Sequence, residues 1–239
     1  MNQTVFQRYE VKYRITRFQQ HQLLRLMRCY MVADEHGRST IQSLYFDTPD
    51  WLLARRSMEH PVYKEKLRLR SYGLPKAEDE VFLELKKKLD GITYKRRLAL
   101  PCAQMSRALG QSNSLSMSQI GRELDFCRDR YRDLKPAMML SYRREAWYGI
   151  DDRELRITFD DTVLWRREDL NLTSGIYGSP LLGTQEVLME VKVASAMPHW
   201  LVQFLSAQKI YKTSFSKYGA AYQRCRMEML HRKEELRYA

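Results

Sequence analysis

The sequence lacks several features that define common classes of protein. Its four cysteines are widely spaced and form no C-x-x-C pair: Cys29, Cys102, Cys127 and Cys225. This spacing argues against a zinc site or a disulfide framework and fits a reducing compartment. No apolar run is long enough to span a bilayer, and the first residues contain no apolar signal-peptide segment. We therefore expect a cytoplasmic protein without a transmembrane segment.

Two catalytic signatures are also missing. The five histidines are scattered and suggest no Ser/His/Asp set: His21, His36, His60, His199 and His231. A Gly-rich phosphate-binding loop is absent as well. Any bound triphosphate must therefore be held by side chains rather than by a P-loop.

What the chain has in excess is positive charge. Its 239 residues include 41 Lys+Arg against 29 Asp+Glu, a formal net charge of +12. Such a field attracts nucleic acid, anionic membranes or phosphorylated small molecules, and composition does not choose among them. The fifteen tyrosines and eight phenylalanines are more typical of strands and cores than of base stacking. The length allows one large domain or two small ones.

Residues 64–70 show how this charge is organised. With a period of two, Leu67 and Leu69 lie on one face of a strand, and four cations lie on the other: Lys64, Lys66, Arg68 and Arg70. One interpretation is a solvated edge strand, where lysines prevent aggregation. The other is a polyanion-binding face. Recurrence of the pattern on other strands favours the second.

The pattern does recur. Alternating segments with a charged face or charged positions occupy 8–15, 81–88, 92–100, 155–160 and 187–193, with further strands predicted at 41–47 and 138–147. Helices are predicted at 16–32, 198–208 and about 216–236, with Thr16 as an N-cap. Residues 102–134 read as helical with a Ser-rich interruption. They form either a lid or outer helical layer, or a simple connector.

A charged sheet face cannot pack against an apolar core, because unpaired buried charge is too costly. We therefore predict an α+β fold: a closed antiparallel eight-stranded tunnel β-barrel with a charged lumen, covered by helices outside, in a single domain over residues 1–239. The predicted lumen carries the carboxylates Glu10, Glu84, Asp160 and Glu190 among the cations Lys12, Lys66, Arg68, Arg70, Lys86, Lys95, Arg144, Arg156 and Lys192. The cations would bind a chain of phosphates, and the carboxylates would hold Mg²⁺ or Mn²⁺.

Seven short motifs carry a family resemblance: Tyr9–Tyr13, Ser43–Asp47, Leu67–Gly73, Phe82–Lys86, Tyr142–Trp147, Leu188–Lys192 and Ser216–Tyr218. In this order and spacing, from Arg8 to about Tyr222, the chain resembles the VTC domain of polyphosphate polymerases. That family is a branch of the triphosphate tunnel metalloenzymes, or CYTH-like superfamily. The superfamily's N-terminal Glu-x-Glu-x-Lys appears here as Arg8-x-Glu10-x-Lys12, so one metal carboxylate is missing, which fits the polymerase branch.

The resemblance and the alternation together assign expected roles. The expected catalytic residues are Arg68, Arg70, Lys86, Arg144 and Lys217. The expected substrate-binding residues are Lys12, Lys66, Lys95, Arg97, Arg156 and Ser216. Glu190 matches the family's metal-binding glutamate, and Glu10, Glu84 and Asp160 are further candidate ligands for Mn²⁺ or Mg²⁺.

The implied activity is transfer of the γ-phosphate of ATP to a growing inorganic polyphosphate chain. The expected partners are ATP and polyphosphate or pyrophosphate, nucleic acid is not expected, and a membrane-protein partner stays open. Two alternatives remain: a tunnel triphosphatase that hydrolyses inorganic or organic triphosphate, and a non-catalytic domain that binds polyphosphate or nucleic acid.

Overall fold

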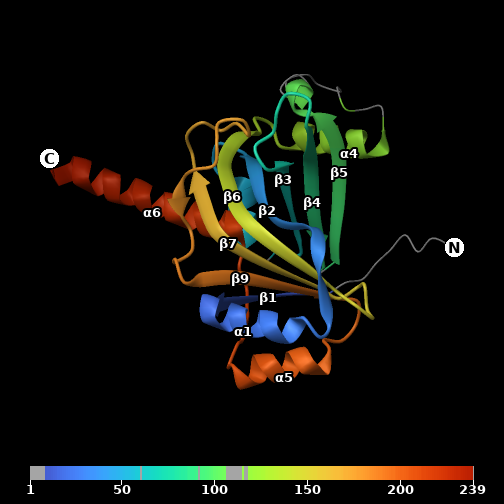
Figure 1. The fold of residues 1–239 in the computed structure, drawn as a ribbon. Helices are drawn as coiled ribbons and strands as arrows, with labels where there is room; N and C mark the ends of the chain where they lie inside the picture. The colour runs from blue at the N-terminus through green and yellow to red at the C-terminus, as the bar shows by residue number, and fades with distance from the viewer. Residues whose placement is uncertain (1–8, 60, 91, 106–114, 116–117, 239) are drawn as a thin grey trace. The chain divides into compact units, whose positions relative to one another are not determined.

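The computed structural model describes residues 9–59, 61–90, 92–105, 115 and 118–238 (Figure 1). The chain divides into two compact units, each built from three separate stretches. Unit 1 comprises residues 1–40, 142–163 and 182–215, and unit 2 comprises residues 41–141, 164–181 and 216–239. None of the helices in the described ranges is both long and apolar enough to cross a membrane.

Unit 1 is an antiparallel sheet with two helices. Strand β1 (Tyr9–Thr16) pairs with β9 (Glu186–Val193) and with the short β10 (Lys212–Thr213), and β9 also pairs with β7 (Arg156–Arg166). Helices α1 (Arg17–Met27) and α5 (His199–Ala207) lie along this sheet (Figure 1). The apolar positions of both helices and of the strands form one core, including Ile15, Leu23, Ile157, Met189 and Leu201.

Unit 2 contains the end of β2 (Met31–Asp47) and three further strands, β3 (Tyr63–Tyr72), β4 (Glu80–Leu89) and β5 (Ile92–Pro101), paired antiparallel in that order. Its other elements are α2 (Leu52–Met58), α4 (Gln119–Arg130), β8 (Ser179–Pro180) and α6 (Lys217–Tyr238), with the beginning of β6 (Lys135–Gly149). Helix α4 packs on the apolar face of the strands, where Leu67, Leu83, Leu85 and Leu124 are buried in one core.

The α+β class is confirmed, but the closed eight-stranded barrel is wrong. Within the described ranges ten strands are paired in the open order β10-β1-β9-β7-β6-β2-β3-β4-β5, with β8 beside β7. The barrel was predicted because charged faces were expected to need a wet interior. In the structure, carboxylates on those faces pair with the cations, as described below, so closure is not required to offset the charge.

One element boundary also differs from the prediction. The helix predicted over 16–32 ends at Met27, and β2 begins at Met31 rather than near Ile41. The run from Val32 to Thr40 is polar and shows no apolar alternation. Its strand conformation therefore depends on pairing with neighbours and not on a local pattern.

The start of α1 follows the prediction closely. The Thr16 hydroxyl accepts a hydrogen bond from the backbone N–H of Gln19 at 3.1 Å, and the Gln19 side-chain oxygen accepts one from the N–H of Thr16 at 2.9 Å. This reciprocal capping box satisfies two amides that would otherwise have no partner in the first turn.

We expect Thr16→Ala to lower the free energy of unfolding by about 1 kcal/mol, because the Gln19 amide loses its acceptor. Thr16→Ser keeps the hydroxyl and serves as the control. Urea unfolding gives the stability difference, and hydrogen exchange at the Gln19 amide localises it. Equal exchange in both variants would contradict the capping role.

Candidate functional site

Three neighbouring strands of unit 2 carry cations at directly opposed positions. In the antiparallel register, Arg68 lies opposite Glu84 and Glu84 opposite Arg97. Residues directly opposite one another lie on the same face of the sheet, and so do the residues two positions away on each strand. We call the following set the cation patch: Lys66, Arg68, Arg70, Lys86, Lys95 and Arg97, arranged around Glu84.

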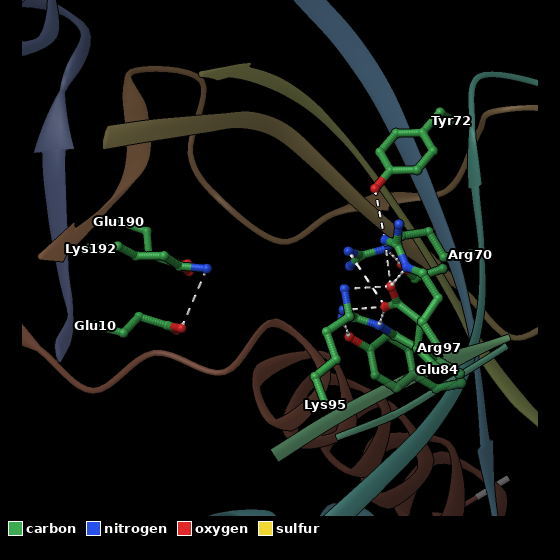
Figure 2. Close-up of polar contacts among 11 residues, drawn as sticks. Glu10, Arg70, Tyr72, Glu84, Lys95, Arg97, Glu190 and Lys192 are labelled. Atoms are coloured by element: carbon green, nitrogen blue, oxygen red, sulfur yellow. Dashed lines mark hydrogen bonds and ion pairs between the residues drawn. The ribbon is translucent and has the colours of Figure 1, made fainter. Parts of the chain in front are cut away.

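Glu84 lies at the centre of this patch with its side chain 1% exposed. One carboxylate oxygen is 2.7 Å from Lys95 Nζ and 2.6 Å from Arg97 Nη2. The other accepts from Arg68 Nε at 2.9 Å and lies 3.6 Å from Arg70 Nη1. Figure 2 shows Glu84 among Arg70, Lys95 and Arg97. Burial alone would raise the pKa of Glu84, but the surrounding cations hold it well below its usual range, so the carboxylate is ionised.

Aromatic residues contact Arg68 and Arg97, the two arginines directly opposite Glu84. Arg68 Nη1 donates to the hydroxyl of Tyr45 at 3.0 Å. Arg97 lies over the ring of Phe82 at 4.3 Å and donates to the Tyr72 hydroxyl at 2.9 Å. Cation–π and hydrogen-bond contacts of this kind restrict the orientation of a guanidinium.

The phenol of Tyr45 is itself perturbed. Burial would raise the pKa of Tyr45, but Arg68, Arg70 and Lys217 outweigh it and bring the pKa below its ordinary value. Tyr45 and Tyr72 were not predicted as site residues. The sequence offered only a weak signal for such a role, because Ser43 and Tyr45 merely alternate along one predicted strand. That they lie opposite Arg70 and Arg68 appears only in the structure.

The start of α6 also reaches the patch. Lys66 Nζ donates to the Ser216 hydroxyl at 2.9 Å, and that hydroxyl accepts from the backbone N–H of Gly219 at 3.1 Å. Lys217 is the first residue of α6. Unit 2 thus brings together nine of the predicted residues: Lys66, Arg68, Arg70, Glu84, Lys86, Lys95, Arg97, Ser216 and Lys217.

A second charged cluster lies in unit 1, where β1 pairs with β9. Lys192 Nζ is 3.1 Å from Glu190 and 3.7 Å from Glu10, and Lys12 Nζ is 3.4 Å from Glu10 and 3.9 Å from Glu190. Figure 2 shows the contact between Lys192 and Glu10. The two carboxylates and the two ammonium groups therefore alternate, and this cluster is balanced in charge.

Two other predicted residues of unit 1 are also paired. Arg144 makes a bidentate contact with Asp160, with Nε and Nη2 at 2.6 and 2.7 Å from the two carboxylate oxygens. Arg156 lies 3.8 Å from Asp34 and over the ring of Tyr148 at 4.8 Å. The bidentate contact holds Arg144 in one orientation, whereas the ion pair of Arg156 is longer than a hydrogen bond.

The carboxylates allow a test of the expected metal site. Among the described residues, no group of three or more His, Cys, Asp or Glu side chains could hold a metal ion. Glu10 and Glu190 nonetheless share one face, and the buried Thr158 hydroxyl, directly opposite Glu190, has no hydrogen-bond partner. Mg²⁺ is commonly held by one or two carboxylates together with substrate phosphates and water. Glu10 and Glu190 fit such a site.

Comparison with known proteins identifies the class. The family model described as VTC domain matches residues 7–226, so the chain belongs to the VTC-domain family. No curated protein matches the chain.

Solved structures show more distant similarity. A "putative adenylate cyclase" from Vibrio parahaemolyticus is 11% identical over 90% of this chain and 96% of its own, with a TM-score of 0.46. The PH1819 protein from Pyrococcus horikoshii is 12% identical over 86% of this chain and 95% of its own, with a TM-score of 0.39.

The patch predicts a pH dependence of anion binding. Burial, opposed by Glu84 and reinforced by Arg97 and Arg70, lowers the pKa of Lys95 to about 8. Lys95 therefore loses its charge as the pH rises through about 8, and affinity for inorganic tripolyphosphate should fall between pH 7 and 9 relative to Lys95→Arg, which stays charged. Calorimetry in EDTA measures the affinity of both proteins across this pH range. Protonation of tripolyphosphate itself affects both proteins equally and cancels in the comparison. Parallel profiles would contradict this assignment.

Proposed function

We propose that this VTC-domain protein is a polyphosphate polymerase that transfers the γ-phosphate of ATP to the end of an inorganic polyphosphate chain. The observation that supports this most is the cation patch, in which six cations surround a single carboxylate on one face of β3, β4 and β5. A patch with such an excess of positive charge suits a ligand with a negative charge on every unit of its length.

Phosphoryl transfer relies mainly on positioning and on electrostatic stabilisation of the transferred group. In this proposal Arg68 and Arg70 neutralise charge that develops on the γ-phosphate, and Lys66, Lys86, Lys95, Arg97, Ser216 and Lys217 hold the neighbouring phosphates. The acceptor, a terminal phosphate, is already an oxyanion and needs no dedicated general base. Within unit 1, Arg144 remains a predicted catalytic residue that neutralises charge on the γ-phosphate, and Lys12 and Arg156 remain predicted phosphate contacts.

Glu10 and Glu190 would hold the Mg²⁺ or Mn²⁺ ion that the family implies. There it would supply positive charge that offsets part of the charge of the phosphates. Lys12 and Lys192 keep the two carboxylates together on one face of the sheet.

The first test is polymer synthesis from ATP and Mn²⁺ by purified protein. We expect wild-type protein to make long polyphosphate and Arg68→Ala to lose at least about a hundredfold in rate, because a charge-neutralising contact is removed. Arg96→Ala is the matched control, since Arg96 pairs with Glu123 and lies on the opposite face of β5. Release of free phosphate without polymer would instead indicate the triphosphatase. Binding without turnover would indicate the non-catalytic domain.

A second test concerns the metal. We expect Glu190→Gln to raise the Mn²⁺ concentration needed for half-maximal activity by about tenfold or more, because one of two carboxylate ligands is lost. Glu186→Gln is the control on the same strand, since Glu186 pairs with Arg14 instead. A Mn²⁺ titration of both variants at saturating ATP measures the effect. Identical curves would remove Glu190 from the metal site.

A further inference from the structure

Glu84 is the single acid on a nine-position surface. Three rows of opposed residues on β3, β4 and β5 contribute Arg70, Phe82 and Ala99, then Arg68, Glu84 and Arg97, then Lys66, Lys86 and Lys95. Opposed side chains in a sheet lie about 4.5–5.5 Å apart at their Cβ atoms, where like charges destabilise each other. Glu84 occupies the middle position, from which one carboxylate reaches cations on both neighbouring strands.

The contacts of Glu84 also fix the orientation of the neighbouring arginines. Arg68 and Arg97 each direct Nε and Nη2 at its carboxylate, at distances from 2.6 to 2.9 Å. A guanidinium held by two adjacent donors has its plane and direction set, and its remaining edge then points in one direction. The Tyr45 hydroxyl accepts from Nη1 of Arg68, and the Tyr72 hydroxyl accepts from Nη2 of Arg97. The arginines are therefore oriented before any ligand arrives.

This arrangement argues against a metal at Glu84. Both of its oxygens are already contacted by cations, and none of its contacts among the described residues is another carboxylate. A divalent ion there would have to displace ammonium and guanidinium groups and would lie among like charges. Glu10 and Glu190 are also contacted by ammonium groups, but at longer distances of 3.1 to 3.9 Å, and they place two carboxylates on one face, which makes them the better donor set.

We propose that Glu84 is a positioning residue for the phosphate chain: its carboxylate aligns Arg68 and Arg97 and, with its further contacts to Arg70 and Lys95, holds four of the six cations of the patch together, without binding metal. The inference rests on the proposed function insofar as the ligand is a phosphate chain. Glu84 then acts as an internal counterion for these cations. A bound phosphate does not need to replace it, because the phosphate contacts the edges of the aligned side chains that face away from Glu84.

Replacing Glu84 with glutamine distinguishes a positioning role from electrostatic attraction alone. Glu84→Gln makes the patch more positive, so a field that acted without positioning would bind polyanions more tightly. If Glu84 aligns the arginines, the same change weakens binding, because the amide offers one acceptor oxygen where the carboxylate offers two, and the cations move apart.

The experiment is calorimetric binding of inorganic tripolyphosphate to full-length protein at pH 7 in EDTA. We expect Glu84→Gln to weaken binding by about tenfold or more, since charge-assisted hydrogen bonds orient the binding groups. Glu123→Gln is the matched control: Glu123 also joins a lysine of β4 to an arginine of β5, Lys87 and Arg96, but from α4 on the opposite face. Its affinity should equal that of wild type.

Glu84→Asp keeps the negative charge and withdraws it by one methylene group. It provides a milder variant if Glu84→Gln does not fold, and intermediate affinity with an unchanged melting temperature supports positioning. Tripolyphosphate affinity equal to or above wild type in both folded variants overturns the inference. So does a shifted Mn²⁺ requirement for polymer synthesis by Glu84→Asp, which would make Glu84 a metal ligand.

The two proposals can fail separately. Wild-type protein that binds tripolyphosphate in EDTA and loses affinity in Glu84→Gln, yet makes no polymer, retains the positioning role and contradicts the polymerase. If wild-type protein makes polymer and Glu84→Gln binds tripolyphosphate as tightly as wild type, the polymerase is retained and the positioning role is contradicted. Wild-type protein that does not bind tripolyphosphate in EDTA overturns the positioning role, and polymer synthesis from ATP and Mn²⁺ then decides the polymerase by itself.

Discussion

Everything in the candidate site depends on how six neighbouring cations are kept on one sheet face. Placed at opposed positions on adjacent strands, they repel each other, and β-sheet pairing alone would not hold them. The ion pairs of Glu84 offset this repulsion from the middle strand, while the leucines on the other face of β3 and β4 pack under α4. One face supplies the stability of the sheet, and the other is available for a ligand.

The two units differ in the balance of their charges. In unit 2 the patch keeps a large excess of positive charge around a single acid. In unit 1, Glu10 and Glu190 alternate with Lys12 and Lys192, and Arg144 is matched by Asp160. An excess of cations favours a polyanion, whereas paired carboxylates are the groups that a hard divalent ion prefers. The two units therefore present two chemically different surfaces.

Much of this could be predicted from alternation along single strands, and the remainder depends on partners distant in sequence. A period of two placed Arg68 and Arg70 on a charged face, and Thr16 marked the start of a helix. Which strand lies beside which follows from tertiary pairing, so the position of Glu84 between Arg68 and Arg97 could not be read from the sequence. The open strand order was missed for the same reason: local patterns do not reveal which carboxylate lies among which cations.

The orientation of Arg68 is finally determined by the core of unit 2. Its guanidinium is held between Glu84 and Tyr45, and the Tyr45 ring stacks on Tyr218 with ring centres 4.4 Å apart. The Tyr218 hydroxyl donates to buried Asp47 at 2.6 Å, and Asp47 also accepts the backbone N–H groups of Leu53 and Ala54 at the start of α2. Because these partners are buried, moving Arg68 would break hydrogen bonds that water cannot replace. Arg68 is thus fixed in one orientation by contacts that also stabilise the fold.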